Sequence, residues 1–459
     1  MFLDLDRKER QRIAVIDDSE RSVSYGDICD FAKTFARYLP QRSLIFILSE
    51  NRIGSLLGYT AALSNRIVPL IINASTEEGL YNHLYDLYQP EYLWMPEDKA
   101  AKMGKEIVFS AWEYSLVKTE NGPTPMYEEL SLLLPTSGST GSPKLVRHSY
   151  RNIEANADNV RLLFKLNGSE KAMAILPMHY TMGLSVIASH LLAGSTLLLS
   201  NRSLLDRGFW SMLKEATSFT GVPYSYEILT KMRFTRMDLP NLKVITQGGG
   251  KLTEAMWNTL AQYAHEKGKQ FIATYGQSEC TARMAYLPPE KALEKVCSIG
   301  IAEPGGQLSI LDDNGKETFE GEAQGEMVYR GENVTLGYAS CREDLMKGDE
   351  NNGVMHTGDL ARRDADGCYF IIGRLKRFLK IFGLRIGLDE VEQMIKEEFR
   401  TDCFCKGTDE KLIILVTDST LQEILPDFVE DKTHLFHQMI EVEVVPAILR
   451  NESGKVINQ

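Results

Sequence analysis

Residues 132–144 read Leu-Leu-Leu-Pro-Thr-Ser-Gly-Ser-Thr-Gly-Ser-Pro-Lys, an apolar run followed by small, hydroxyl-bearing residues and one lysine. Gly138 and Gly141 allow positive φ, and successive backbone N–H groups in such a loop can form an anion-binding nest. Lys144 adds a positive charge. A Walker loop needs Gly-Lys-[Ser/Thr], whereas Pro143 precedes this lysine. The segment therefore predicts a phosphate-binding loop after a strand; an exposed flexible loop is the alternative on composition alone.

The regions on both sides of this loop alternate between strand-like and helix-like patterns. Before it we expect strands at Ser43–Leu48, Arg66–Ile72 and Tyr92–Met95, with helices at Ile53–Ser64 and Glu77–Tyr88. After it we expect strands at Ala172–Leu176, Ser195–Leu199, Phe219–Val222, Lys243–Thr246 and Gln270–Thr274, with helices at Arg151–Phe164 and Thr253–Lys267. This alternation predicts two doubly wound α/β subdomains with parallel sheets.

The pattern changes after residue 295, where strand-like pieces such as Gln307–Leu311, Gly325–Arg330 and Cys368–Ile372 are separated by Asn-Gly and Asp-Gly turns. These pieces predict a small, antiparallel, barrel-like unit. Beyond residue 380 we expect helices at Leu388–Phe399 and Pro426–Met439 and strands at Lys411–Thr417 and Glu441–Val445. The fold class is thus α/β, with a small α+β C-terminal domain.

The composition narrows the classes of protein to which the chain can belong. The net charge of −12 argues against nonspecific binding to nucleic acid or to an anionic membrane. We expect no signal peptide and no membrane span, because the N-terminus is charged from the fourth residue and no uncharged apolar run approaches the required length. The seven scattered cysteines predict reduced thiols and a cytoplasmic location.

Several further segments carry chemistry. Glycine-rich Gln247-Gly-Gly-Gly250 and Thr274-Tyr-Gly-Gln-Ser-Glu279 each follow an expected strand. Thr357-Gly-Asp359, the basic segment Gly373-Arg-Leu-Lys-Arg-Phe-Leu-Lys380, Gly383-Leu-Arg-Ile386 and Pro446-Ala-Ile-Leu-Arg-Asn-Glu-Ser-Gly-Lys455 come later. Taken singly, each has an ordinary interpretation: a tight β–α turn, a helix N-terminal glutamate, a solvated basic patch or a solvated terminal lysine.

Taken in this order, the segments resemble the motifs of the adenylate-forming superfamily, which includes acyl- and aryl-CoA synthetases, peptide-synthetase adenylation domains and firefly luciferases. The resemblance implies that Tyr275 stacks on adenine, that Asp359 and Arg374 bind the ribose, and that Glu279 with Thr140 holds Mg²⁺. It implies further ATP contacts from Thr136, Ser137, Gly138, Ser139, Gly141, Lys144, Gly248, Gly249, Gly250, Thr274, Gly276, Gln277, Ser278 and Lys376.

The resemblance also implies a division of the chain. Residues 1–373 would form the AMP-binding body, residues 374–380 a hinge centred on Lys376, and residues 381–459 a mobile C-terminal domain. Lys455 would be the mobile lysine that bridges the carboxylate and the α-phosphate, where a cation neutralises the charge of two approaching anions. The chain departs from the family in its shorter N- and C-terminal regions and in Ser278, where threonine is commoner.

The nature of the acid is indicated by Pro177-Met-His-Tyr-Thr-Met-Gly-Leu184, which resembles the P-x-x-H-x-x-G-L of acyl- and aryl-CoA synthetases. His179 would then lie at the acyl pocket; a structural histidine is the alternative. Amino-acid-activating members usually carry an aspartate here, and no acidic residue occurs between Lys171 and Leu205. An unpaired buried ammonium is costly, so a fatty or aryl acid is favoured. Arg283 and Tyr286 are further candidates for lining the site.

The sequence therefore predicts an enzyme that uses ATP and Mg²⁺ to convert a carboxylic acid to an acyl-adenylate, with release of pyrophosphate, and then transfers the acyl group to CoA. Two alternatives stay open. One is a free-standing ligase that loads an acyl or amino acid onto a carrier-protein phosphopantetheine. The other is a non-catalytic nucleotide-binding homologue.

Overall fold

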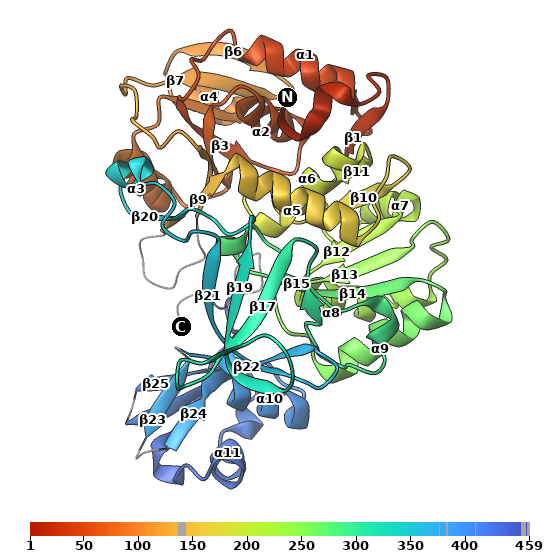
Figure 1. Cartoon of the computed structure of the whole chain (residues 1–459), viewed down its shortest axis with the longest axis vertical. Coiled ribbons are helices and arrows are strands. Elements are labelled where there is room, and N and C mark those ends of the chain that lie inside the picture. The colour runs from red at the N-terminus through yellow and green to blue at the C-terminus, as the bar shows by residue number, and fades with distance from the viewer. Residues whose placement is uncertain (136–143, 376, 382–383, 409, 451–455, 457–459) are drawn as a thin grey trace.

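The structure is a computed structural model that describes residues 1–459 except 136–143, 376, 382–383, 409, 451–455 and 457–459. The first large sheet lies at the top of the molecule, the second large sheet and a smaller antiparallel sheet lie side by side below it, and a C-terminal α+β unit lies at the bottom (Figure 1). No helix in the described part of the chain is long and apolar enough to cross a membrane.

The first large sheet has the strand order β20-β9-β8-β4-β3-β5-β7-β6. Its centre, β8-β4-β3-β5, is parallel, and its edges are antiparallel. The strands are β3 Leu44–Ser49, β4 Val68–Asn73, β5 Tyr92–Pro96, β6 Ile107–Ala111, β7 Tyr114–Lys118, β8 Leu130–Pro135, β9 Leu145–Ser149 and β20 Gly337–Ala339. β3 and β4 are almost wholly buried, as expected of apolar strands covered on both faces.

The second large sheet has the order β16-β15-β14-β13-β12-β10-β11-β1-β2, and β14 to β1 are parallel. The strands are β1 Ile13–Asp17, β2 Ser22–Ser24, β10 Lys171–Ala174, β11 Thr196–Leu199, β12 Ser218–Gly221, β13 Val244–Gln247, β14 Gln270–Tyr275, β15 Ala285–Tyr286 and β16 Ile301–Ala302. The N-terminal strand β1 thus pairs with β11, far away in sequence, which local patterns could not predict.

Helices cover both sheets, and α5 (Tyr150–Leu163) and α6 (Thr181–Ala193) lie between them (Figure 1). α5 begins at Ser149, whose hydroxyl accepts the Asn152 N–H while the Asn152 side chain accepts the Ser149 N–H. α6 ends at Gly194 in the left-handed region (φ 74°). The other helices of the body are α1 Tyr25–Phe35, α2 Ile53–Ser64, α3 Glu78–Tyr88, α4 Glu97–Lys102, α7 Arg207–Glu215, α8 Pro223–Lys231 and α9 Glu254–Glu266.

The unit after residue 295 is an open antiparallel sheet of order β18-β17-β19-β21-β22 rather than the barrel-like unit that the turn pattern predicted. Its strands are β17 Gly306–Leu311, β18 Glu317–Thr318, β19 Ala323–Gly331, β21 Val354–Arg363 and β22 Tyr369–Arg374. The sheet does not close, because β18 has only two residues and cannot pair along β22 at the other edge.

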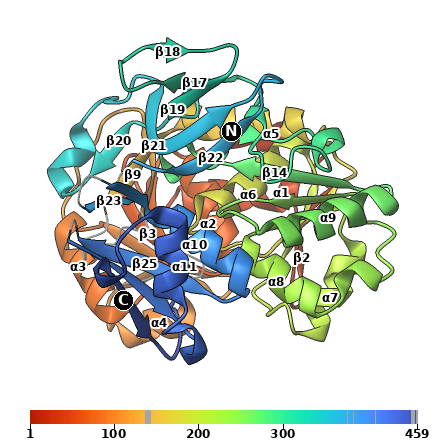
Figure 2. The ribbon, with the colours of Figure 1, turned by 90° about the horizontal axis from the view of Figure 1, so that it is seen from below.

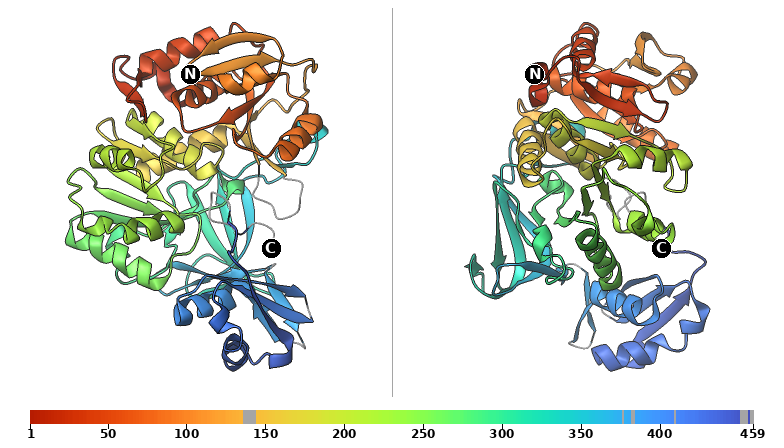
Figure 3. Two further views of the ribbon diagram at one scale, coloured as in Figure 1. Left: turned by 180° about the vertical axis from the view of Figure 1, so that it is seen from behind. Right: turned by 90° about the vertical axis from the view of Figure 1, so that its right-hand side faces the viewer.

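β22 leads into the C-terminal unit at one end of the molecule (Figure 3), whose helices α10 and α11 face the viewer in Figure 2. This unit contains β23 Phe378–Ile381, β24 Leu384–Gly387, α10 Leu388–Phe399, β25 Cys403–Thr408, β26 Lys411–Val416, α11 Leu425–Thr433 and β27 Ile440–Val444. It has its own apolar core, whose buried members run from Leu379 to Val442. The helix expected at Pro426–Met439 is wrong at its end, because His434 turns left-handed (φ 58°) and stops α11.

Candidate active site

The segments singled out in the sequence converge at the carboxyl ends of β13 and β14. Gln247 ends β13, Tyr275 ends β14, and the two strands are parallel neighbours. The antiparallel sheet brings Asp359 of β21 and Arg374 of β22 to the same edge, where they face each other across the strand pair. In open α/β sheets, ligands bind outside the carboxyl ends of the strands.

A network of polar side chains links three of the predicted motifs. The Tyr275 hydroxyl donates to Asp359 Oδ2. Gln277 Nε2 donates to Tyr275 Oη at 3.1 Å, to Asp359 Oδ2 at 3.1 Å and to the Thr357 carbonyl at 3.0 Å. Arg374 Nε lies 3.1 Å from the other Asp359 oxygen. The structure therefore joins the segments around Tyr275, Asp359 and Arg374 into one site.

Burial sets the charge state of this network. Asp359 is 4% exposed, and burial raises the pKa of its carboxyl, which the Arg374 charge and the Tyr275 and Gln277 hydrogen bonds oppose. Burial, with the Asp359 charge next, raises the pKa of Tyr275 well above its usual value. Tyr275 is thus a neutral donor, and Asp359 is an acceptor held between an arginine and a phenol. Such an acceptor suits a pair of ligand hydroxyls.

A second cluster joins the end of the loop motif to Glu279. The Lys144 ammonium lies 5.7 Å from the centre of the Tyr338 ring, and the Tyr338 hydroxyl donates to Glu279 Oε1 at 2.6 Å. Tyr338 lies on β20, which pairs with β9 directly after Lys144. Sequence reasoning missed Tyr338, because only the long-range pairing of β20 with β9 brings it to the site.

The glycine-rich turn after β13 packs so closely against its neighbours that a side chain on Gly248 or Gly250 would collide with them. A Cβ on Gly248 would lie 2.5 Å from Met182 Cε and 2.7 Å from Thr274 Oγ1, and Gly249 has a φ of +77°. A Cβ on Gly250 would lie 3.1 Å from Pro223 Cγ. The Thr274 hydroxyl donates to the Gln247 carbonyl at 2.9 Å and so ties the turn to the start of the Tyr275 motif. Glycine is therefore required here by close packing against neighbouring side chains and by the positive φ of Gly249.

The stretch around His179 connects β10 to α6 at the same edge. His179 is half-buried, with its ring centre 5.6 Å from that of Tyr180 in an edge-to-face arrangement. Two residues on, the Thr181 hydroxyl lies 3.2 Å from the Ser278 hydroxyl. The first turn of α6 thus contacts the Tyr275–Glu279 segment, as expected if this stretch borders an acyl pocket.

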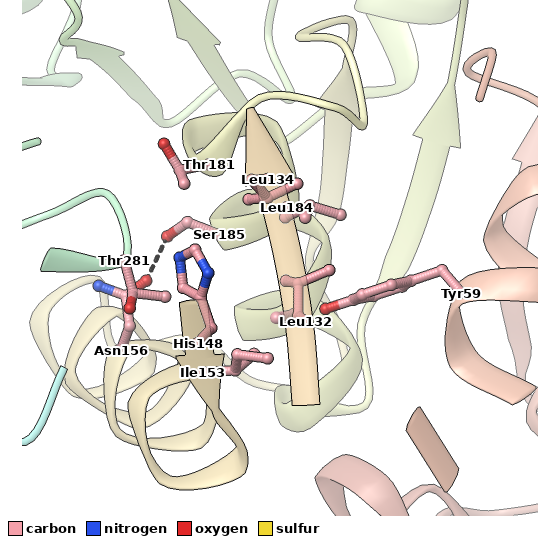
Figure 4. A pocket seen from close by; sticks show the side chains of 11 residues that line it. Tyr59, Leu132, Leu134, His148, Ile153, Asn156, Thr181, Leu184, Ser185 and Thr281 are labelled. Carbon is pink, nitrogen blue, oxygen red and sulfur yellow. Dashed lines mark hydrogen bonds between the residues drawn. The ribbon is translucent and has the colours of Figure 1, made fainter. Parts of the chain in front are cut away.

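Behind this contact lies a cavity of only about 10 Å³, lined in part by Thr181, Ser185 and His148 (Figure 4). Neither His148 nitrogen has a hydrogen-bond partner in the described structure, and burial lowers its pKa to about 4. Figure 4 shows the Ser185 hydroxyl directed to Asn156, to which it donates at 2.7 Å. The space suits one water rather than a substrate.

A comparison with protein-family models matches residues 4–339 to the AMP-binding enzyme family. The chain belongs to this family.

Curated relatives of this chain include a probable CoA ligase CCL9 of Humulus lupulus, 30% identical over 275 residues. The alignment covers 58% of this chain and 51% of that one. The oxalate–CoA ligase of Arabidopsis thaliana is 30% identical, covering 58% and 52%. A 2-succinylbenzoate–CoA ligase of Bacillus cereus (strain Q1) is 29% identical, covering 61% and 59%. The matches therefore span about half the length of the first relatives.

Solved structures extend the likeness of fold to almost the whole chain. The o-succinylbenzoate CoA synthetase of Bacillus subtilis, in complex with its acyl-adenylate intermediate, superposes with a TM-score of 0.81 at 20% identity and covers 99% of this chain and 96% of its own. The same enzyme with ATP and magnesium gives a TM-score of 0.79 at 20% identity, covering 99% and 98%. At this identity the likeness establishes the fold.

Some predicted site residues of this AMP-binding enzyme lie outside the described residues: Thr136, Ser137, Gly138, Ser139, Thr140, Gly141, Lys376 and Lys455. Within the described part of the chain, no three His, Cys, Asp or Glu side chains gather to hold a metal ion. Glu279 is a half-buried carboxylate near Lys144, which fits a Mg²⁺ ion whose remaining ligands are phosphate oxygens and water.

Proposed function

We propose that this chain activates a carboxylic acid as an acyl-adenylate and then transfers the acyl group to the thiol of CoA. One observation carries the proposal: Tyr275, Asp359 and Arg374 form one hydrogen-bonded site at the carboxyl edge of the sheet, next to the Glu279–Tyr338–Lys144 cluster. The aromatic ring of Tyr275 suits adenine, and the Asp359 carboxylate suits the two ribose hydroxyls. Lys144 with Glu279 suits phosphate and its magnesium ion.

In the first half-reaction, a carboxylate oxygen attacks the α-phosphorus of ATP. The bond from the α-phosphorus to the bridging oxygen breaks, and pyrophosphate leaves with the electron pair. Tyr275 and Asp359 hold the nucleoside, while Lys144 and the loop 136–143 hold the phosphates. Mg²⁺, when bound through Glu279 and Thr140, neutralises phosphate charge. Lys455 draws the two anions together, which is a proximity and charge effect.

In the second half-reaction, the thiol sulfur attacks the acyl carbonyl carbon. The carbonyl–oxygen bond to AMP breaks, AMP leaves, and the thiol proton passes to solvent. We assign residues 1–373 to the nucleotide-binding body, 374–380 to a hinge and 381–459 to a mobile domain. The self-contained core between Leu379 and Val442 supports this division, because a unit with its own core can turn as a rigid body.

A thioester product is supported by the relatives that are named as CoA ligases for oxalate, indoleacetate and 2-succinylbenzoate. The His179 stretch has no acidic residue to pair with an ammonium, which argues against an amino acid as substrate. A carrier-protein phosphopantetheine remains the alternative acceptor. The cytoplasmic location stays a prediction, supported by seven cysteines that are all free thiols.

The deciding experiment is acid-dependent exchange of labelled pyrophosphate into ATP, run on a panel of fatty, aryl, dicarboxylic and amino acids. We expect exchange with at least one acid, and thioester formation when CoA is added. Formation of the thioester only with a phosphopantetheinylated carrier protein would replace the acceptor. AMP or ATP binding without exchange for any acid would leave a non-catalytic nucleotide-binding protein.

Two variants, one at the proposed site and one control, test whether the exchange takes place at this site. Glu279→Gln should lower exchange about 100-fold, since it removes the carboxylate at the phosphates. Glu332→Gln removes a surface acid that pairs with Arg151, and it should leave exchange unchanged. Equal rates in the two variants would remove Glu279 from the proposed site.

A further inference from the structure

Arg283 is a buried cation with unused hydrogen-bond donors. Its side chain is 1% exposed, and its guanidinium carbon lies 5.5 Å from the centre of the Phe164 ring. Among its nitrogens, only Nη1 has a hydrogen-bond partner within the described residues, the Ser185 hydroxyl at 2.8 Å. Nε and Nη2 have no hydrogen-bond partner in the described structure. A guanidinium buried with free N–H groups is costly, and an anion that accepts from both would remove the cost.

The backbone holds Arg283 in this position. Thr281 and Ala282, which precede it, both have positive φ, 51° and 88°. The Arg283 carbonyl accepts from Asn333 Nδ2 at 2.8 Å. Ser185, which accepts from Arg283, donates in turn to Asn156 Oδ1 at 2.7 Å. Strained backbone that is retained next to an active site is a mark of function, and here it presents a fixed guanidinium.

The nearest buried acid does not neutralise Arg283. Glu303 makes no ion pair with it within the described residues; its Oε1 accepts from Asn159, Asn333 and Tyr329 instead. Burial raises the pKa of Glu303 to about 8, so this carboxyl is largely protonated at neutral pH. Burial also lowers the pKa of Arg283 to about 10, which still leaves the guanidinium charged. The site therefore keeps a net positive charge.

Arg283 also borders a second, larger cavity, of about 380 Å³, between α5, α6 and the strands β12 to β14. Its polar lining includes one acid, Glu170, and two lysines, Lys165 and Lys243, together with Ser189, Ser218, Thr220, Thr246, His190 and Gln270. Ser185, the partner of Arg283, lies one helical turn before Ser189 on α6. Arg283 therefore forms the end of the cavity that is nearest the first turn of α6.

The first turn of α6 connects this end of the cavity to the Tyr275–Glu279 segment. Thr181, in contact with Ser278, precedes Ser185 by four residues, or about 6 Å along the helix. Met182, which follows Thr181, and Ala282, which precedes Arg283, belong to one small apolar cluster with Leu176 and Val222. Met182 reaches Gly248 of the glycine-rich turn. An acid bound here would meet apolar side chains first and a buried cation beyond them.

We propose that the acid is a dicarboxylate: one carboxylate is adenylated, an apolar spacer crosses the Met182–Ala282 cluster, and the distal carboxylate pairs with Arg283. This inference rests on the proposed function and names its substrate class. Arg283 is then a specificity-determining residue that contacts the substrate without taking part in bond making.

The test compares each dicarboxylate with its own monomethyl ester in pyrophosphate–ATP exchange by the wild-type chain, using succinate, glutarate, adipate and phthalate. We expect kcat/KM for the preferred diacid to exceed that for its ester about 100-fold, since a site built for an ionised partner rejects the analogue that lacks it. Arg283→Met should lose this preference because kcat/KM falls for the diacid and stays the same for its ester. Arg283→Lys should restore part of the preference. The wild-type comparison decides even where Arg283→Met does not fold.

The outcomes separate the two proposals. Exchange with esters or simple monoacids at rates equal to the diacids overturns the inference but leaves the acyl-adenylate function intact. The same conclusion follows if a diacid preference survives unchanged in Arg283→Met. Absence of exchange with every acid overturns both. In the supporting case, the diacid alone should also raise the melting temperature of the wild type more than that of Arg283→Met.

Discussion

Asp359 is the residue at which the nucleotide motifs meet. It accepts hydrogen bonds from Tyr275 and Gln277 on one side and pairs with Arg374 on the other, so a single carboxylate sets the geometry of three segments. The Arg374 side chain is 55% exposed, so solvent weakens its ion pair with Asp359. Asp359 itself is 4% exposed, and the pairing of β21 with β22 fixes its position opposite Arg374.

Asp359→Asn should weaken AMP binding. The amide cannot accept from the ribose and Arg374 as a carboxylate does, and hydrogen bonds to charged groups are worth about 1.5–3 kcal/mol, so affinity should fall about 10- to 100-fold. Isothermal titration calorimetry with AMP measures this affinity. Asp364→Asn, which loses an ion pair to Lys295 near the same sheet, should bind AMP normally. Unchanged affinity in Asp359→Asn would contradict the ribose role.

Glu303 makes stability depend on pH. Its folded pKa, about 8, is above the unfolded value of about 4.3, so the folded chain keeps a proton that the unfolded chain releases. Stability from this group is fully present below the unfolded pKa and is lost as pH rises toward 8, by at most about 1.4 kcal/mol per pH unit.

Urea unfolding of the wild type and Glu303→Gln at pH 5, 6, 7 and 8 measures this effect. The wild type should lose stability with rising pH relative to the variant. Glu317→Gln is the control, because Arg330 lowers the pKa of that acid and its removal should not flatten the fall. Parallel profiles for wild type and Glu303→Gln would mean that Glu303 is ionised when folded.

The sequence predicted Tyr275, Asp359 and Arg374 as one nucleotide site, because their motifs keep a recognisable order and spacing. It raised Arg283 only as a candidate and missed Tyr338 and Glu303. An arginine or tyrosine is ordinary in any loop. Arg283 is distinguished by two buried nitrogens, Nε and Nη2, that lack hydrogen-bond partners in the described structure, and this depends on how α5 and α6 pack around it. Burial of this kind leaves no local pattern.

At the scale of elements, the turn from Tyr275 to Arg283 decides how the site is built. It carries Glu279 to Tyr338 and then turns through two left-handed residues to bury Arg283. Gly276 makes this possible, since a Cβ there would lie 1.4 Å from the Ala282 carbonyl oxygen. The close approach of two backbone segments is the physical reason for glycine at this position.

Gly276→Ala should therefore destabilise the chain by about 1–3 kcal/mol or more, because the collision is with backbone that cannot swing away. It should also lower exchange by displacing Glu279. Gly79→Ala is the matched control: it lies on exposed α3, meets no atom within 4 Å, and should stabilise by about 0.5–1 kcal/mol. Comparable urea midpoints for the two variants would show that the turn can relax.

Element boundaries were predicted best for two helices, one apolar on all faces and one amphipathic. Ile53–Ser64 and Leu388–Phe399 are helices with the expected bounds. Periodicity could not reveal that α11 stops at Thr433, since the stop depends on His434 adopting a left-handed conformation that no glycine signals. Periodicity also does not indicate whether the two edge strands of a sheet pair with each other. The open antiparallel sheet was therefore predicted as barrel-like.

At the scale of the whole molecule, the alternation of strands and helices predicted the α/β class but not which strands are neighbours. β1 joins the second large sheet beside β11, and β20 joins the first beside β9. These crossings hold the two sheets around α5 and α6 and bring Tyr338 to Glu279. The C-terminal unit, by contrast, has a separate apolar core formed by its own residues.

A separate C-terminal core would let the chain present different surfaces in the two proposed half-reactions, and a Lys455 variant tests this proposal. Lys455→Ala should reduce pyrophosphate exchange about 100-fold or more, because it removes the cation between two approaching anions. Thioester formation from preformed acyl-adenylate and CoA should change only a few-fold. Lys411→Ala, which removes a surface lysine of the same unit paired with Glu441, is the matched control. If Lys455→Ala slowed both half-reactions equally, one arrangement of the unit would have to serve both, and the hinge at 374–380 would have no catalytic purpose.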